Sequence, residues 1–240
     1  MSPTLPNDPK IYFPDESALI LFYQSAGAQF LRPYEMRGEN IHDKLQNDMK
    51  FRNSYLEVYS RGMFDYCETI SSYMPEECAN MMDIGCGLGM VPLILSNKYH
   101  NTPNFWMLDK SVDIKDIKRA HGSFHNDGYI FTASLQTTSD FLFLNGIDPA
   151  LIHLLEVNPS VFNKVPDLDL VLSRNSWGFH YPLSTYIDEV CLKLKETGRA
   201  IIDVRKGTGG MEILNDRFSH IKIALDSPKS LRVIASNSPI

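Results

Sequence analysis

The residue pattern best suited to chemistry lies in the segment MMDIGCGLGMV, residues 81–91, where three alternating glycines follow a short apolar run that includes an acid, Asp83. Glycine lets a backbone approach a ligand closely and adopt positive φ, at an entropic cost that ordinary loops have no reason to bear. A second acid, Asp109, closes the next apolar run, FWMLD. Acids at the carboxyl ends of neighbouring parallel strands border the crevice in which doubly wound α/β folds bind ligands. The spacing therefore predicts a strand, a glycine loop and a helix that together hold a small ligand.

The rest of the chain must supply the elements that position this loop. Apolar runs bounded by turn residues predict strands over 81–84, 105–109, 152–157, 168–173 and 199–205, with a closing antiparallel pair over 220–227 and 231–236. Helical patterns cover 16–31, 54–74 (ended by Pro75), 90–98, 113–120, 136–145 and a stretch from Leu183 through Leu194 that Gly198 ends. Residues 128–134 fit a short strand or a loop. This alternation predicts an α/β, Rossmann-like sheet of seven strands, mostly parallel, with helices on both faces.

We expect two parts along the chain. Residues 1–75 would form an N-terminal helical cover that acts as a substrate lid, and residues 76–240 would form the ligand-binding domain. Four side chains of the cover could reach the cleft, namely Arg52, Tyr55, Tyr59 and Arg61.

The composition narrows the class of protein. Hydrophobic residues make up 43% and charged residues 22% of the 240 positions, as in ordinary globular proteins. The net charge of −6 argues against a protein that grips polyanions, so we expect no nucleic-acid partner. No stretch approaches the roughly 18 apolar residues of a membrane span, and the first residues lack a signal-peptide pattern. The four cysteines form no CxxC pair. Reduced thiols and a cytoplasmic location are therefore expected, with no membrane partner.

The pattern DIGCGLG, of the form D-x-G-x-G-x-G, together with Asp109 at the end of the next strand, resembles the class I S-adenosylmethionine (AdoMet)-dependent methyltransferases over roughly residues 76–238. The segments SRNSWGFHYP (173–182) and IIDVRKGTGG (201–210) further resemble bacterial proteins described as sugar O-methyltransferases. The resemblance implies AdoMet as cofactor and a small molecule or glycan as methyl acceptor. It implies an O-methyltransferase that acts on a hydroxyl of a sugar or a sugar-containing metabolite.

In that family the glycine loop holds the amino-acid tail of AdoMet, which implies cofactor contacts at Asp83, Gly85, Cys86, Gly87 and Gly89. Asp109 is placed to accept hydrogen bonds from both ribose hydroxyls. Lys110 and Asn158 are next to the expected adenine slot. Two alternatives for the loop stay open. One is a tight connection that binds nothing, and the second is a nicotinamide cofactor site, whose G-x-G-x-x-G pattern is broken here by Met90.

The resemblance also directs the segment after the fourth strand, residues 173–182, toward the transferred methyl group. A hydroxyl is a poor nucleophile while protonated, so O-methyl transfer gains from a base whose pKa lies near neutrality, and His180 is the candidate. Substrate contacts are assigned to Arg174, Trp177, Tyr181 and Arg205, with Trp177 able to stack on the apolar face of a sugar. The alternative makes Trp177 and Tyr181 packing residues and His180 a hydrogen-bonded structural histidine.

Asp203 closes the fifth strand and is the second candidate for catalysis, as a base or as a metal ligand of the kind found in catechol-type O-methyltransferases. An ion pair with a neighbouring arginine is its structural alternative. Ser173 and Arg174 stand where a further carboxylate ligand would be needed, so we expect no metal. The loop also lacks the Asn/Asp-Pro-Pro-Tyr/Phe arrangement of enzymes that methylate nucleic-acid amines. Two alternatives for the function stay open. The methyl acceptor could be another small-molecule hydroxyl or an amine, or the protein could be a catalytically silent AdoMet-binding regulator.

Overall fold

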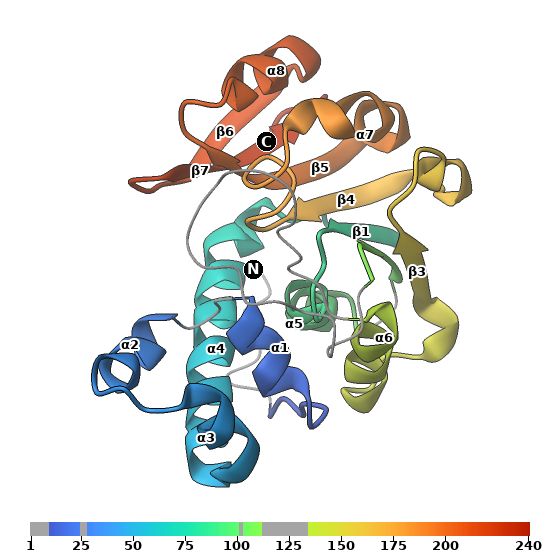
Figure 1. The fold of residues 1–240 in the computed structure, drawn as a ribbon. Coiled ribbons are helices and arrows are strands. Elements are labelled where there is room, and N and C mark those ends of the chain that lie inside the picture. Colours follow the sequence, from blue (N-terminus) through green and yellow to red (C-terminus); the bar gives the residue numbers. More distant parts are fainter. Residues whose placement is uncertain (1–9, 25–27, 101–102, 112–133) are drawn as a thin grey trace.

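The structure is a computed structural model that describes residues 10–24, 28–100, 103–111 and 134–240. Within these residues seven strands form one sheet in the order β3-β2-β1-β4-β5-β7-β6 (Figure 1). The strands are β1 (Asn80–Ile84), β2 (Asn104–Asp109), β3 (Ile152–Glu156), β4 (Leu168–Ser173), β5 (Leu194–Arg205), β6 (His220–Asp226) and β7 (Ser230–Ser236). Strands β1 to β5 pair in parallel, and β7 pairs antiparallel with both β5 and β6. The predicted Rossmann-like sheet and its closing antiparallel pair are confirmed.

Helices cover both faces of the sheet, as the sequence predicts. On one face lie α1 (Ser17–Tyr23), α2 (Ala28–Met36), α3 (Ile41–Asn47), α4 (Met49–Ile70), α5 (Met90–Ser96) and α6 (Leu135–Leu144). On the other face lie α7 (Ile187–Lys193) and α8 (Gly210–Arg217). Short 3-10 helices occupy Ser71–Tyr73, Asn97–Tyr99, Pro149–Leu151, Val161–Lys164 and Leu183–Thr185. Figure 1 shows α1 to α4, in blue and cyan, gathered at one side of the sheet.

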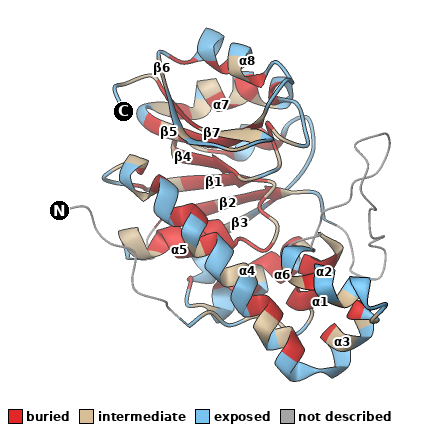
Figure 2. Cartoon of the chain, turned by 90° about the vertical axis from the view of Figure 1, so that its left-hand side faces the viewer, coloured by how far each residue is buried: buried red, intermediate tan, exposed pale blue. Residues whose placement is uncertain are grey.

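Two apolar clusters pack against the sheet, one on each face. Met81 of β1 belongs to the cluster shared with α1 to α6, whereas its neighbour Met82 belongs to the cluster shared with α7 and α8. This alternation follows from the period of two along a strand, and burial on both faces explains why the central strands are apolar throughout. Figure 2 shows these central strands as buried layers between helices.

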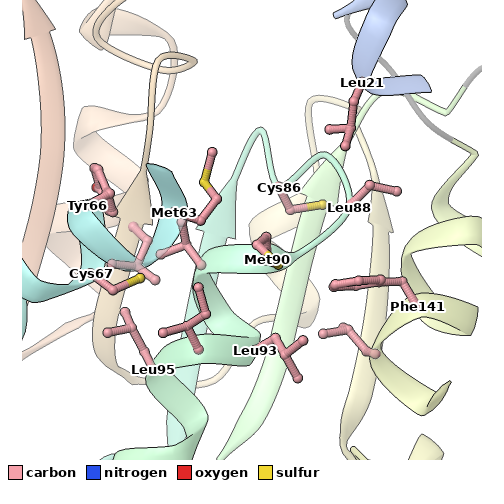
Figure 3. Close-up of a cluster of buried hydrophobic side chains, with 14 of the residues drawn as sticks. Leu21, Met63, Tyr66, Cys67, Cys86, Leu88, Met90, Leu93, Leu95 and Phe141 are labelled. Carbon is pink, nitrogen blue, oxygen red and sulfur yellow. The ribbon is translucent and has the colours of Figure 1, made fainter. Parts of the chain in front are cut away.

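The N-terminal helices are part of this core. Leu21, Leu45 and Tyr66, from α1, α3 and α4, lie in the same cluster as the buried face of α5. Figure 3 shows Leu21 and Met63 close to the glycine loop and α5. The segment expected to form a lid over the cleft therefore shares the hydrophobic core of the sheet, and α4 is held beside the carboxyl ends of the strands.

Several helix boundaries differ from the sequence predictions. The helix expected over 16–31 is divided, because α1 ends at Tyr23 and α2 begins at Ala28. The helix expected from residue 54 begins at Met49, since the Asp48 carboxylate caps it by accepting a hydrogen bond from the Phe51 backbone N–H at 3.0 Å. That helix ends at Ile70, ahead of Pro75. The predicted helix over 113–120, and all but the last residue of the segment 128–134, lie outside the described residues.

The prediction that Gly198 ends a helix is wrong, because Gly198 lies inside β5. The α7 helix ends at Lys193, and β5 begins at Leu194 with an irregular register that pairs Leu168 with Leu194 and Leu170 with Arg199. A Cβ at Gly198 would lie 2.8 Å from Leu194 Cδ1 and 3.0 Å from the Leu168 carbonyl oxygen. The glycine allows close contact between β4 and the bulged part of β5. In the sequence alone, a glycine required by this packing looks the same as a glycine that ends a helix.

No helix in the described ranges has both the length and the apolar character needed to cross a membrane.

Candidate functional site

A cavity of about 460 Å³ opens where β1, β2 and β4 end. This volume lies in the range of roughly 300–1,000 Å³ that is usual for small-molecule sites. Its walls come from the end of α1, from α4, from the glycine loop with the start of α5, and from the segment after β4. The predicted site residues that line it are Asp83, Gly85, Cys86, Gly87, Asp109, Arg174, His180 and Tyr181. The position at the carboxyl ends of parallel strands is the one at which open α/β sheets bind ligands.

The glycine loop follows β1 with left-handed backbone at its three glycines, with φ of 78° at Gly85, 54° at Gly87 and 79° at Gly89. The Gly85 N–H donates to the Leu108 carbonyl at 2.7 Å, which ties the loop to β2. A Cβ on Gly85 would lie 1.9 Å from Ser176 Oγ. Glycine is therefore required there because the segment after β4 packs directly on the loop.

Gly87 is held from two sides. Its N–H donates to Asp109 Oδ2 at 2.8 Å, and its carbonyl accepts from Thr138 Oγ1, on α6, at 2.6 Å. Gly89 precedes α5 as its N-cap and does not line the cavity. The Cys86 side chain is largely buried beside Leu88 and Met90 in the apolar cluster of Figure 3, and burial raises the pKa of its thiol. The loop is thus a rigid backbone surface rather than a reactive one.

Two carboxylates face the cavity from neighbouring strands. Asp83 is 5% exposed, and burial, followed by repulsion from Asp109, raises its pKa to about 8, although Arg174 opposes this shift. Burial also raises the pKa of Asp109 to about 6, against hydrogen bonds that Asp109 accepts from the backbone N–H groups of Gly87 and Lys110. Two acids that are costly to ionise in the same cavity are well placed to receive a cation or hydroxyl donors.

The raised pKa of Asp83 predicts that Asp83→Asn stabilises the ligand-free protein at alkaline pH. In the folded protein the carboxyl holds its proton up to about pH 8, whereas its ordinary value is 3.8. The unfolded chain therefore releases this proton at a lower pH than the folded protein does, so the free energy of unfolding falls progressively as pH rises through this window, and asparagine removes that loss. Melting temperatures from about pH 4 to pH 9 should diverge in favour of the variant as pH rises. Asp65→Asn, at an exposed position of α4, is the control; parallel curves for Asp83→Asn and the native chain would contradict the prediction.

The segment after β4 forms a compact turn that carries the candidate base. The Ser176 carbonyl accepts from the N–H groups of Phe179, His180 and Tyr181 at 3.0, 2.8 and 3.1 Å. Burial, followed by the Arg205 charge, lowers the pKa of His180 below its usual 6.5, so its imidazole is neutral at pH 7. Burial and the Asp109 charge raise the pKa of Tyr181. A neutral imidazole and a phenol therefore line the same cavity as the glycine loop.

The prediction that Trp177 stacks on a substrate is wrong, because Trp177 is a core residue. Its indole is fully buried, and its Nε1–H donates to the Leu183 carbonyl at 3.0 Å. An indole with no exposed surface cannot contact a ligand, so the packing alternative holds for this residue. Arg205 does not line the cavity either; its guanidinium lies 5.7 Å from the ring centre of Phe179, behind the wall.

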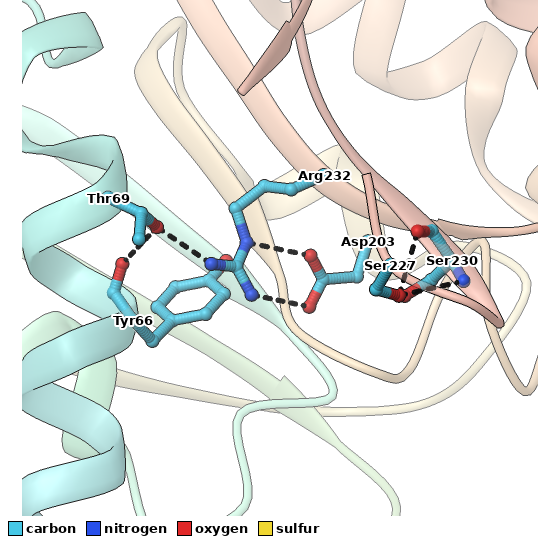
Figure 4. A network of polar contacts seen from close by, with 6 residues as sticks. All are labelled: Tyr66, Thr69, Asp203, Ser227, Ser230 and Arg232. Atoms are coloured by element: carbon cyan, nitrogen blue, oxygen red, sulfur yellow. Dashed lines mark hydrogen bonds and ion pairs between the residues drawn. The ribbon is translucent and has the colours of Figure 1, made fainter. Parts of the chain in front are cut away.

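Asp203 is also away from the cavity wall. Its carboxylate accepts from Arg232 Nε at 2.9 Å and from Arg232 Nη2 at 3.4 Å, and its side chain is 4% exposed (Figure 4). The ion-pair alternative describes this contact. No group of three or more histidine, cysteine, aspartate or glutamate side chains in the described ranges is arranged to hold a metal ion.

Lys110 and Asn158, expected beside an adenine slot, lie outside the cavity lining. The Asn158 side chain closes its own turn, donating to the Glu156 carbonyl at 2.8 Å and accepting from the Ser160 N–H at 3.0 Å. Such local bonding is common for asparagine after a strand. Lys110 is exposed, and its backbone N–H donates to Asp109 Oδ1 at 2.7 Å.

Of the four side chains suggested in the N-terminal cover, Tyr59 lines the cavity, and burial raises its pKa to about 12. Tyr55 is fully buried beside Phe30, and Arg61 pairs with Glu57 on the exposed face of α4. Arg52 is not part of the lining. Sequence reasoning missed Gln24, at the end of α1, and Met63; both reach the cavity through tertiary contacts that leave no local pattern.

No known family profile matches the chain, and no curated protein matches it. Solved structures do. Precorrin-6y C5,15-methyltransferase from Geobacter metallireducens is 20% identical with a TM-score of 0.51, over 71% of this chain and 86% of that one. An O-methyltransferase family protein from Burkholderia thailandensis is 9% identical with a TM-score of 0.53, over 81% and 63%. A 16S rRNA N2 G1207 methyltransferase from T. thermophilus, in complex with AdoMet and guanosine, is 11% identical with a TM-score of 0.51, over 73% and 43%.

These similarities concern the fold. The names of the three proteins include a C-, an O- and an N-methyltransferase, so the shared fold does not select the acceptor atom. The chain therefore has the Rossmann-like α/β fold of these methyltransferases.

Proposed function

We propose that this protein is an AdoMet-dependent O-methyltransferase that acts on a hydroxyl of a sugar or a sugar-containing metabolite. One observation carries the proposal. A single cavity is lined both by the glycine loop with Asp83 and Asp109 and by His180 and Tyr181. A cofactor site and a candidate base thus share one space, as methyl transfer requires.

The residues present fit AdoMet. The left-handed glycine loop offers backbone without side chains in the way of the amino-acid tail. Asp83 is a buried acid suited to the cationic part of that tail. Asp109 keeps unused acceptor capacity on both oxygens, since each accepts one N–H from the backbone, and could accept the two ribose hydroxyls. When bound, AdoMet supplies an electrophilic methyl group on a sulfonium.

His180 would then remove the proton of the acceptor hydroxyl. Its lowered pKa keeps the imidazole neutral at neutral pH, so that one ring nitrogen carries no proton. A general base needs this state. Tyr181 beside it offers a hydroxyl that can donate to, or accept from, the acceptor. The turn closed by the Ser176 carbonyl holds both side chains on one wall. Orientation of this kind contributes to catalysis by fixing the nucleophile near the methyl group.

The sugar acceptor is the finer part of the proposal. It rests on the resemblance of residues 173–182 and 201–210 to sugar O-methyltransferases and on the polar character of the part of the cavity that residues 174–181 line. Asn175, Ser176, His180 and Tyr181 all line the cavity, and hydroxyl-rich ligands are recognised by side chains of this kind. The neutral or small acceptor is also consistent with the net charge of −6.

Asp109→Ala should weaken binding of S-adenosylhomocysteine, the demethylated cofactor, by about 1.5–3 kcal/mol, roughly 10- to 150-fold, because charge-assisted hydrogen bonds to the ribose are lost. Isothermal titration calorimetry measures this directly. Glu156→Ala is the matched control, because Glu156 ends β3 as Asp109 ends β2 but does not line the cavity. Equal affinity of Asp109→Ala and the native chain would remove Asp109 from the site.

Turnover separates an enzyme from a silent cofactor-binding protein. Formation of S-adenosylhomocysteine from AdoMet should depend on an acceptor drawn from a panel of free and nucleotide-linked sugars, with methylated hydroxyls identified by mass spectrometry and NMR. Binding without turnover on any sugar, other hydroxyl or amine acceptor would favour the silent regulatory role. Turnover restricted to amines would contradict the O-methyl assignment.

A further inference from the structure

Arg174, the first residue after β4, is held in place but keeps one donor without a partner. Its guanidinium carbon lies 5.4 Å from the ring centre of Tyr66, within the distance of a cation–π contact. Its Nε is buried and makes no hydrogen bond to any described residue. Arg174 also lines the cavity. A buried N–H of a charged group is costly to leave unpaired, so this geometry favours a ligand that supplies an acceptor.

A carboxyl group, that of Asp83, faces the same cavity from the adjacent strand. Asp83 lies near the end of β1, which pairs with β4 through Asp83 and Leu172. Arg174 and Asp83 influence one another, and both influence Tyr59, because Arg174 lowers and Asp83 raises the pKa of the Tyr59 hydroxyl. Across the described parts of the chain, however, neither side chain forms an ion pair with the other. A buried donor without a partner and a carboxyl group that border one space without pairing suit a ligand that carries both signs, because a cation bound beside Asp83 favours its ionised form.

We propose that Arg174 binds the carboxylate of the amino-acid tail of the cofactor while Asp83 binds its ammonium, so that the two strand ends form a receptor for a zwitterion. The inference deepens the proposed function and rests on it. The Arg174 fork can donate from Nε and a terminal nitrogen to the two oxygens of one carboxylate. This assignment moves Arg174 from the acceptor side, where sequence reasoning placed it, to the cofactor.

The Tyr66 ring that contacts Arg174 is itself held in place by other side chains. It has a second arginine, Arg232, with its guanidinium carbon 3.8 Å from the ring centre. Arg232 is fixed in turn by Asp203 and by donation from its Nη1 to Thr69 Oγ1 at 2.7 Å, as Figure 4 shows. Asp203 lies outside the cavity lining and is linked to Arg174 only indirectly, through Arg232 and the Tyr66 ring.

Calorimetry with two ligands tests the proposal. S-adenosylhomocysteine and its decarboxylated analogue differ only in the carboxylate. The native protein should bind the first about 10- to 100-fold more tightly, the worth of hydrogen bonds to a charged group. Arg174→Gln should lose that preference by weakening S-adenosylhomocysteine alone, and Arg174→Lys should retain part of it. Asp83→Asn should weaken both ligands by a similar factor, because both keep the ammonium. Arg61→Gln, on the exposed face of α4, is the matched control.

The outcomes distinguish the receptor from the proposed function on which it rests. If the native protein binds neither ligand, the proposed function fails and the receptor fails with it. If it binds both equally well, Arg174 does not read the carboxylate, although the cofactor assignment stands; this comparison needs no variant and so survives a misfolded Arg174→Gln. Equal weakening of both ligands by Arg174→Gln also overturns the receptor. Unchanged binding with a raised KM for the acceptor would return Arg174 to the acceptor side.

Discussion

Replacing His180 with glutamine should lower kcat by about 10²- to 10⁴-fold, the usual contribution of a positioned general base. Glutamine keeps the size and hydrogen-bonding capacity of the side chain but cannot accept the hydroxyl proton. The Kd for S-adenosylhomocysteine should stay nearly unchanged, because we assign His180 to the acceptor hydroxyl and not to the cofactor. Single-turnover and steady-state rates with a methyl acceptor measure the effect.

The pH–rate profile gives a second reading of His180. Because burial and Arg205 lower the pKa of His180, the rate should rise with pH along the acidic limb, through an ionisation below pH 6.5, and be flat around neutrality. The Gln variant should lack that limb. His153→Gln is the matched control, since His153 stacks on Trp106 in the sheet and does not line the cavity. A His180 variant with near-native kcat would make it a structural histidine.

Arg232→Met should destabilise the protein by about 3–5 kcal/mol, because it leaves Asp203 as an unpaired charge in the interior. The side chains are 11% and 4% exposed, and the pair is bonded through both carboxylate oxygens. The variant also loses the Tyr66 ring contact and the bond to Thr69. Urea denaturation of the ligand-free protein measures the free energy of unfolding.

The double variant Arg232→Met/Asp203→Leu separates the charge from the packing. It should recover much of the loss, because a buried ion pair replaced on both sides by apolar groups of similar size is often neutral in stability. Lys206→Met, which removes an exposed partner of Asp226, is the control and should cost less than about 1 kcal/mol. A loss below about 1 kcal/mol in Arg232→Met would show that Asp203 is not held as a buried charge.

The strands and the glycine loop were predictable because their signals are local. Each central strand is buried on both faces, so its residues are largely apolar, and an acid or a polar residue lies at or next to its end, as Asp83 does in β1 and Ser173 in β4. The two-residue period of a strand and the short turn between β1 and α5 leave few alternatives. Asp83, Gly87 and Asp109 consequently line one cavity, as their spacing predicts. The closing antiparallel pair of β6 and β7 was equally predictable from the sequence.

Other features depend on contacts between segments far apart in the chain. Gly198 looks like a helix stop but lies in a bulged strand against Leu168, and Trp177 looks like a stacking platform but fills the core. Asp203 and Arg205 alternate along β5, yet one pairs with Arg232 of β7 and the other packs on Phe179. A residue's type limits what it can bind, whereas the free energy of burial and pairing selects the partner. The partners of Arg174, Asp203 and Trp177 could therefore be read only after α4, β4, β5 and β7 had packed together.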